Sequence, residues 1–424
     1  MRIYKYPTRE IWHEIISRPE YDPEPLRKQV SSILKRVREE GDEAVRYYTR
    51  HFDKVEIKDF LVPAVQVSGA GSFVMDDLKN AIDIALKNVT RFHEQQIIPH
   101  ETIITSPGVK CWLKTEPIEK IGLYIPGGSA PLISTVLMLG VPARLTGCRE
   151  IIMCTPPGKN GEIHPALLYT AGVLGIDKIF RIGGAQAIGA MAYGTDSIPA
   201  VYKIFGPGNQ YVTIAKQLVS LDGIAIDFPA GPSEVVVLAD YTADPVFVAS
   251  DLLAQAEHGP DSQAMLVTDH EPLLKAVQSE VSRQLINLPR KSYIEESLTH
   301  SCLLLMNDFE EMIEIINAYA PEHLIIMTEN YDEQITYIRN AGSVFLGHYS
   351  PESAGDYASG TNHTLPTNGY ARAFSGIGLN SFQKVISIQE ITKKGLQNLA
   401  PAIEHLAEAE SLLAHKNAVA VRLG

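Results

Sequence analysis

The stretch EKIGLYIPGGSAPLISTVLMLGVPARLTG, residues 119–147, decides the fold, because a short apolar strand leads through paired glycines into an apolar helix. The order of strand, glycine turn and helix returns at residues 177–194 (DKIFRIGGAQAIGAMAYG) and at residues 200–219 (AVYKIFGPGNQYVTIAKQLV). Residues 150–158, EIIMCTPPG, indicate one more strand. Strands that alternate with helices predict βαβ units, so we expect these segments to form a parallel sheet.

A second alternating set begins at residues 233–240, SEVVVLAD, and further apolar strands follow at residues 264–269, 301–306, 323–328 and 342–347. Helical segments separate them, as in the first set. We therefore predict an α/β fold with two Rossmann-like domains made of parallel-sheet βαβ units, a small N-terminal segment and a C-terminal helical tail.

The expected domain organisation has four parts. Residues 1–21 are an N-terminal segment, and residues 22–123 and 235–383 together form an α/β domain that carries most metal and catalytic candidates. Residues 124–234 form an α/β domain with a nucleotide cleft, and residues 384–424 form the tail. The boundaries between the two α/β domains fall at glycine-rich motifs and not at flexible linkers, so we expect the domains to pack tightly against each other.

Local patterns predict several further elements. The apolar stripe within residues 24–50 predicts one long helix, and residues 77–96 predict a second. In the tail, a helix at residues 402–416 and a short strand at residues 418–423 are expected. Residues 348–382 have little hydrophobic periodicity and are expected to form a long functional loop.

Composition limits the classes of function. The chain has 424 residues, of which 45% are hydrophobic and 21% charged, and its net charge of -13 argues against nucleic-acid binding. Its four cysteines show no CxxC spacing, which favours a reducing compartment. The N-terminal sequence has no apolar core of a signal peptide, and no apolar run approaches the roughly 20 residues of a membrane span. A cytoplasmic protein without a membrane partner is expected.

The glycine turns favour a nucleotide site. Gly127–Gly128, Gly183–Gly184 and Gly206–Pro207–Gly208 each follow a strand and precede a helix, where backbone N–H groups can approach a pyrophosphate. None forms a GxGxxG fingerprint, and each by itself is better explained as a tight turn. All three together favour a nucleotide cleft, with three polar side chains beside them: Tyr124, Gln186 and Asn209.

Two polar pairs stand at the ends of apolar elements. Gln255 and His258 lie three residues apart at the end of an apolar helix, so they share one face. Helix-dipole stabilisation by the histidine is the structural alternative. Glu322 and His323 follow Pro321 at the start of an apolar strand, where they are either an inconsequential ion pair or acid–base groups for proton abstraction.

Two more segments hold candidate residues. Asp356 and His363 lie in the expected loop, where turn formation by the aspartate and surface exposure of the histidine are the alternatives. Glu410 and His415 lie five residues apart, about 140° around a continuous helix, so they share a site only if that helix ends near Ala414.

Taken together, these motifs resemble the histidinol dehydrogenase family along nearly the whole chain. The most specific segments are GLYIPGGSAPL, GPGNQYV, DFPAGPSE, AQAEHGPDSQA, APEHL, SAGDYASGTNHTLPT and LAEAESLLAHKNAV. The resemblance implies oxidation of L-histidinol to L-histidine through an aldehyde, with two NAD reduced, as the last steps of histidine biosynthesis. It also implies a homodimer with exchanged C-terminal tails, in which Glu410 and His415 complete the partner's site.

The resemblance assigns roles residue by residue. One zinc ion per subunit is implied, held by Gln255, His258, Asp356 and His415. His323 corresponds to the general base, and Glu322 to the group that activates water. The implied NAD contacts are Tyr124, Gln186 and Asn209. The implied substrate contacts are Ser233, His363 and Glu410, together with Gln255, His258, His323, Asp356 and His415.

Two other functions are rivals to this assignment. An aldehyde dehydrogenase acting through a cysteine thiolate would use Cys154, although no histidine lies near it in sequence. A nucleotide-binding protein with a structural zinc is the second rival, but structural zinc sites are closed and usually rich in cysteine.

Overall fold

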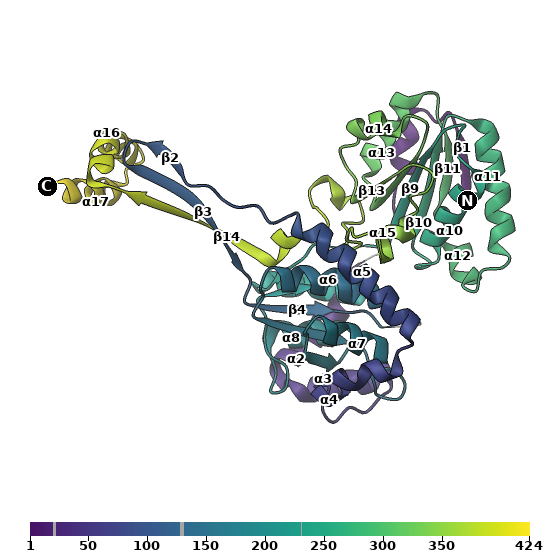
Figure 1. Cartoon of the computed structure of the whole chain (residues 1–424), viewed down its shortest axis with the longest axis horizontal. Helices are drawn as coiled ribbons and strands as arrows, with labels where there is room; N and C mark the ends of the chain where they lie inside the picture. Colours follow the sequence, from purple (N-terminus) through teal and green to yellow (C-terminus); the bar gives the residue numbers. More distant parts are fainter. Residues whose placement is uncertain (20–22, 128–130, 230) are drawn as a thin grey trace.

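The computed structural model describes residues 1–19, 23–127, 131–229 and 231–424, and contains two parallel sheets and a projecting antiparallel arm (Figure 1). Gly128 of the first glycine turn lies outside the described residues. The five-stranded sheet, called here the β4 sheet, has the order β6 (Lys178–Arg181), β5 (Glu150–Thr155), β4 (Lys120–Tyr124), β7 (Lys203–Phe205) and β8 (Ala225–Ile226).

The six-stranded sheet, called here the β9 sheet, is also entirely parallel. Its order is β1 (Arg2–Lys5), β11 (Cys302–Leu305), β10 (Gln263–Thr268), β9 (Glu234–Ala239), β12 (His323–Met327) and β13 (Ser343–Leu346). Every residue of β9, β10, β11 and β12 is buried. Strands that are covered on both faces need continuous apolar sequence, and this explains why the sequence predicted them correctly.

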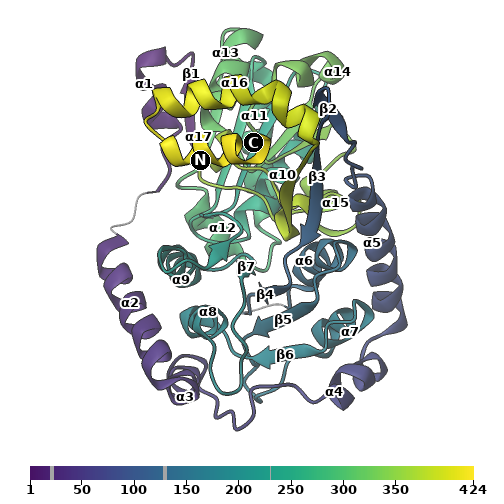
Figure 2. The ribbon, with the colours of Figure 1, turned by 90° about the vertical axis from the view of Figure 1, so that its left-hand side faces the viewer.

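Helices cover both faces of the β4 sheet (Figure 2). One face is covered by α2 (Pro23–Glu40), α3 (Asp42–Tyr48), α8 (Gly184–Tyr193) and α9 (Gln210–Leu221). The other is covered by α4 (Ala64–Gly69), a 3-10 turn (Ala70–Phe73), α5 (Asp76–Glu94), α6 (Ile133–Leu145) and α7 (Pro165–Val173).

The β9 sheet is covered in the same way. One face packs against α10 (Pro245–Ala256), α11 (Glu271–Leu285) and α12 (Lys291–Ser297). The other packs against α1 (Arg9–Ile15), α13 (Phe309–Tyr319), α14 (Tyr331–Gln334) and the 3-10 turn Ile335–Tyr337. Among the residues described, no helix is both long and apolar enough to cross a membrane.

This packing differs from the expected domain partition in two places. Strand β1, within residues 1–21, pairs with β11 and belongs to the β9 sheet. Helices α2, α3 and α5, within residues 22–123, cover the β4 sheet, and α5 shares its cluster there with Ile377 and Phe382. The reason is that an amphipathic stripe reports only that a helix is covered, and not which sheet covers it.

The arm consists of a three-stranded antiparallel sheet and two helices (Figures 1 and 2). Its strands are β2 (Ile103–Ser106), β3 (Val109–Pro117) and β14 (Gln383–Ile391), and its helices are α16 (Lys393–Ala409) and α17 (Leu413–Leu423). The prediction of a strand at residues 418–423 is wrong, since these residues continue α17 and Val419 packs in it as a buried side chain. Burial of one face of α17 here outweighs the preference of its valines for β-strands.

Two other local predictions need correction. The long helix expected over residues 24–50 is broken at Gly41, which has a φ of +56°, and it continues as α3 and a π-helical turn at Thr49–Asp53. Residues 348–382 are not structureless, because they contain α15 (Glu352–Tyr357) and the 3-10 turns Tyr370–Arg372 and Leu379–Phe382. A helix of six residues is too short to produce a clear hydrophobic period.

Candidate active site

Glu322 and His323 lie at the amino end of β12, beside the first residue of β9. The Glu234 N–H donates to Glu322 Oε2 at 2.9 Å, and His323 Nδ1 lies 3.3 Å from the Glu234 carbonyl oxygen. A carbonyl can only accept, so this contact places the proton of neutral His323 on Nδ1 and leaves Nε2 as the acceptor. Nε2 has no hydrogen-bond partner among the described residues.

Burial sets the charge state of this pair. The His323 side chain is 5% exposed, and burial, with smaller contributions from His258 and His363, lowers its pKa to about 3. Burial raises the pKa of Glu322 well above its ordinary value, although the Glu234 N–H opposes this shift. Near neutral pH the pair is therefore an unprotonated imidazole, which can accept a proton, beside a carboxyl group that ionises reluctantly.

Three side chains beside this pair bring ligand atoms together. One atom each from His258, Glu352 and Asp356 lies within 4.8 Å of the others. Asp356 Oδ1 is 3.7 Å from His323 Nε2, and Glu352 Oε1 is 3.7 Å from His323 Nδ1. Burial raises the pKa of Asp356 to about 7 and that of Glu352 well above its ordinary value. A bound cation would remove this cost of ionisation, so the donor set fits a divalent metal.

Gln255 completes this group from the last turn of α10. Its amide is fully buried and faces the Glu352 carboxylate. In one orientation Nε2 donates to Glu352 Oε2 at 2.9 Å and Oε1 accepts from the Glu234 N–H at 3.2 Å. In the other orientation Oε1 turns toward the carboxylate, which is the arrangement that two oxygen ligands of one cation adopt.

The predicted residues Ser233 and His363 frame the same region. Ser233 directly precedes β9, and its carbonyl accepts from the Gln263 N–H at 3.1 Å. His363 Nε2 lies 3.1 Å from the hydroxyl oxygen of Ser134 in α6, and burial lowers the pKa of His363 to about 4. This contact joins the loop after α15 to the β4 sheet, so the amino edge of the β9 sheet faces the carboxyl edge of the β4 sheet.

The predicted nucleotide residues all lie at that carboxyl edge. Tyr124 ends β4, and its hydroxyl accepts from the Gly184 N–H at 3.0 Å. Gln186 is 1% exposed and its Oε1 has no partner among the described residues. Asn209 caps α9 by accepting from the Val212 N–H at 3.2 Å. Since strand order reverses between β4 and β7, these residues lie at a topological switch point.

Glu410 and His415 do not join the site of their own subunit. Glu410 follows α16 and His415 lies in the first turn of α17, and both are exposed on the arm. In Figure 1 the arm extends away from α10 and α15, which carry or adjoin the other predicted ligands. One chain therefore unites Gln255, His258 and Asp356, but not the two tail residues.

Sequence reasoning missed Glu352 and Glu234. Glu352 precedes Asp356 by four residues, and this spacing on a helix was the available signal. Glu234 acts here through its backbone N–H and C=O groups, and no sequence pattern reports such contacts.

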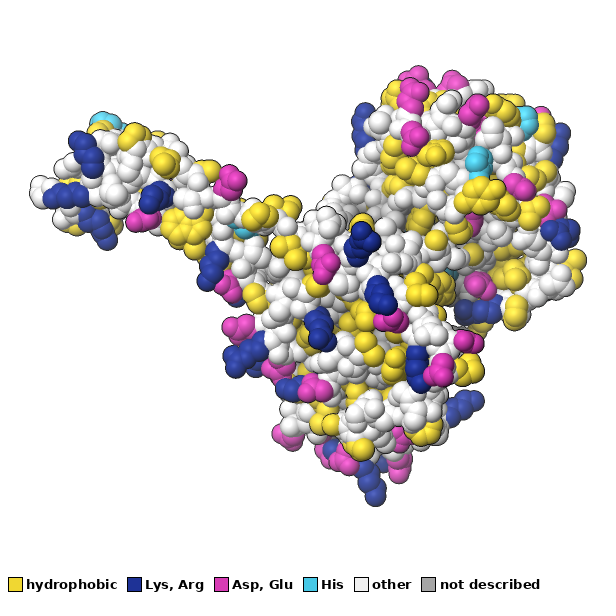
Figure 3. Space-filling view, viewed as in Figure 1, with side chains coloured by type: hydrophobic (Ala, Val, Ile, Leu, Met, Phe, Trp, Pro, Cys, Tyr) yellow, Lys and Arg dark blue, Asp and Glu magenta, His cyan; other side chains and the backbone are white. Residues whose placement is uncertain are grey.

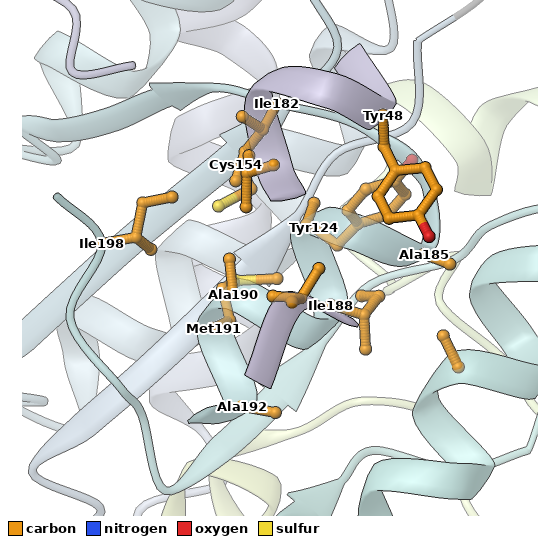
Figure 4. Packing of buried hydrophobic residues seen from close by; sticks show 14 of the residues in the cluster. Tyr48, Tyr124, Cys154, Ile182, Ala185, Ile188, Ala190, Met191, Ala192 and Ile198 are labelled. Carbon is orange, nitrogen blue, oxygen red and sulfur yellow. The ribbon is translucent and has the colours of Figure 1, made fainter. Parts of the chain in front are cut away.

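The rival nucleophile Cys154 is buried in apolar packing (Figure 4). Its exposure is 0%, and Ile182, Ala190 and Met191 belong to the same cluster. Burial raises the pKa of this thiol strongly, so the thiolate is disfavoured. The surroundings of Cys154 are those of a core residue and not of a nucleophile.

The two covered parallel sheets, the buried carboxyl–imidazole pair and the adjoining ligand cluster define an α/β enzyme. The family model for histidinol dehydrogenase matches residues 16–423. The chain is 58% identical over 423 residues to the histidinol dehydrogenase of Bacteroides thetaiotaomicron, covering 100% of this chain and 99% of that one. It is 50% identical over 419 residues to that of Escherichia coli K12, covering 98% and 96%. The chain belongs to the histidinol dehydrogenase family, whose members are oxidoreductases of histidine biosynthesis.

Solved structures agree with this assignment. The crystal structure of histidinol dehydrogenase from Elizabethkingia anophelis superposes with a TM-score of 0.97 at 52% identity, covering 100% of this chain and 98% of that chain. An acetylating aldehyde dehydrogenase from Geobacillus thermoglucosidasius gives a TM-score of 0.50 at 14% identity, covering 89% and 96%. This second likeness concerns the fold alone.

Proposed function

We propose that the protein catalyses the zinc- and NAD-dependent four-electron oxidation of L-histidinol to L-histidine through an aldehyde. The observation that carries this proposal is the buried Glu322–His323 pair, whose imidazole Nε2 lies 3.7 Å from Asp356 Oδ1 in the ligand cluster. The pair stands at the edge of a Rossmann-like β9 domain that faces the glycine turns of a Rossmann-like β4 domain. Family membership supports the substrate, and the site supports proton transfer beside a cation.

We assign the metal to Gln255, His258, Asp356 and the His415 of a second subunit. When bound, zinc would supply a positive centre that orients the amine and imidazole of the substrate. Gln255 and Asp356 offer oxygen ligands, and His258 offers a ring nitrogen, a set that suits zinc, manganese or cobalt. Glu352 lies within the same cluster and offers one more carboxyl oxygen next to these ligands.

His323 is assigned as the general base. Its neutral ring offers Nε2 as a proton acceptor, while the Glu234 carbonyl holds the Nδ1 proton. Glu322 lies beside the same ring nitrogen, with Oε2 at 3.6 Å from Nδ1, and would take the proton from water in the second half-reaction. Ser233, His363 and Glu410 would contact substrate, with Glu410 opposite its ammonium group.

NAD is assigned to the carboxyl edge of the β4 sheet. Tyr124, Gln186 and Asn209 follow or border three strands that end there, and the unpartnered Gln186 Oε1 is an acceptor for a ligand hydroxyl or amide. When bound, NAD would accept hydride from the carbon held between the two sheets.

The arm supports a homodimer with exchanged tails. Figure 3 shows hydrophobic side chains on its surface. Exposed hydrophobic residues of the arm include Ile104 at 72%, Leu406 at 66% and Val421 at 64% exposure. Helices α16 and α17 bury only small residues and one valine: Gly395, Ala400, Ala407 and Val419. Because this core is too small to hold the arm in place by itself, we infer that a second copy of the chain covers the arm. The four free cysteines support the proposed cytoplasmic location.

Mixed dimers test the site and the exchange together. A dimer of His415→Asn with His323→Asn contains one intact site only if the tails are exchanged. Random mixing should then restore about a quarter of the wild-type sites, because half the dimers are mixed and each has one intact site. The readout is NADH absorbance with L-histidinol, alongside zinc content. Each variant alone should be inactive, and mixtures that stay inactive would contradict exchanged tails.

A further inference from the structure

One buried ion pair sits directly behind the proposed catalytic pair. Arg18 Nη2 donates to Glu234 Oε2 at 2.8 Å, and Arg18 Nε donates to Glu234 Oε1. Their side chains are 15% and 2% exposed. The Asn368 N–H donates to Glu234 Oε1 at 2.9 Å, so both carboxylate oxygens of Glu234 are held.

The backbone of the same glutamate holds both proposed catalytic residues. Its N–H donates to Glu322 Oε2 at 2.9 Å, and its carbonyl oxygen faces His323 Nδ1 at 3.3 Å. A rotation of Glu234 would therefore disturb the carboxyl group and the imidazole together. The tautomer of His323 depends on the same contact.

Arg18 also holds the chain that leads into Glu322. Its Nη2 donates to the Tyr319 carbonyl oxygen at 2.8 Å, and its guanidinium stacks 4.0 Å from the Tyr319 ring centroid. Tyr319 ends α13, and only two residues separate it from Glu322. Arg18 thus connects the amino ends of β9 and β12 from an N-terminal segment outside the site.

We propose that Arg18 is a positioning residue, which sets the geometry of Glu322 and His323 through Glu234 and Tyr319. This inference rests on the catalytic roles proposed above. Buried ion pairs are poor sources of stability compared with apolar packing, so orientation is the better explanation for this one. A planar guanidinium can hold the carboxylate by two parallel bonds, which an ammonium group cannot.

Arg18→Ala and Arg18→Lys test this role. In Arg18→Ala we expect kcat to fall about 10- to 100-fold, as small misplacements of catalytic groups do, with KM for L-histidinol and zinc content nearly unchanged. Arg18→Lys should retain more of kcat than Arg18→Ala, because lysine keeps the positive charge but cannot form the two parallel hydrogen bonds of a guanidinium. A cavity of about 140 Å³ borders Arg18, so methylguanidine should enter and restore part of the kcat of Arg18→Ala.

The matched control is Arg283→Ala, which removes an exposed ion pair with Glu280 and should leave kcat unchanged. Circular dichroism and melting temperature establish that each variant is folded. Wild-type kcat in folded Arg18→Ala, or a loss that neither lysine nor methylguanidine relieves, overturns the positioning role. Full turnover by His323→Asn overturns the base assignment itself, so the two failures are distinguishable.

Discussion

Gly206→Ala should weaken NAD binding as well as destabilise the fold. Gly206 follows β7 with a φ of +125°, and an added Cβ would lie 2.0 Å from the Tyr124 carbonyl oxygen. The backbone of Gly206 is also held by two hydrogen bonds. Its N–H donates to Asp227 Oδ2 and its carbonyl accepts from Lys216 Nζ, both at 2.8 Å. The alanine can be accommodated only if this loop or the end of β4 moves.

The expected losses of stability and of NAD binding follow from the backbone conformation of Gly206 and from its contact with Tyr124. The left-handed backbone costs an alanine about 1–3 kcal/mol of folding free energy. Real Cβ atoms essentially never approach another atom within 3.0 Å, so a 2.0 Å contact forces a shift of about 1 Å. A displacement of that size beside Tyr124 and Asn209 should raise KM for NAD about 10- to 100-fold.

Gly223→Ala is the matched control, because Gly223 also has a positive φ, +91°, but no described atom lies within 4 Å of an added Cβ. Urea unfolding should show a loss of stability in both variants, larger in Gly206→Ala because of the steric contact, and initial rates at varied NAD should show a raised KM only in Gly206→Ala. An unchanged KM in Gly206→Ala, or an equal rise in Gly223→Ala, would refute the reasoning.

Three further outcomes are expected. Lys216→Met leaves Asp227 buried without its partner, so the free energy of unfolding in urea should fall by about 3–5 kcal/mol, and Asp227→Asn in the same chain should recover part of it. Burial raises the pKa of Asp53 to about 6 from 3.8, so the stability it contributes below pH 3.8 is lost as pH rises through 6. Asp53→Asn should therefore raise the melting temperature at pH 8 relative to wild type but not near pH 3.5, and the same gain at both values would contradict this. Iodoacetamide should leave turnover intact because Cys154 is 0% exposed, whereas stoichiometric inactivation at Cys154 would favour a thiolate mechanism.

Most strands of the two parallel sheets could be predicted because their sequence is largely apolar, whereas the edge strands β1 and β8 were not predicted. Strands β4, β5, β9 and β12 are covered on both faces, so each is a short hydrophobic run bounded by turn residues. The arm strands could not be predicted, because β3 pairs with β14 across more than half the chain and both faces are largely accessible to solvent.

The sequence predicted which residues form the site, but not all of the contacts that hold them together. Motifs singled out Gln255, His258, Glu322, His323 and Asp356, and the structure brings all five to one edge of the β9 sheet. Two other participants, Glu352 and Glu234, gave no comparable sequence signal, because one lies in a six-residue helix and the other contributes backbone groups.

The amino-acid sequence by itself determined where apolar strands, glycine turns and chemically capable side chains occur, because these depend on neighbours within a few residues. Only the tertiary structure decided that Arg18, Glu234 and Tyr319 meet behind His323, and that Glu410 and His415 remain on a projecting arm. Such contacts join residues hundreds of positions apart, and they form only when burial of apolar surface packs whole helices and strands against one another.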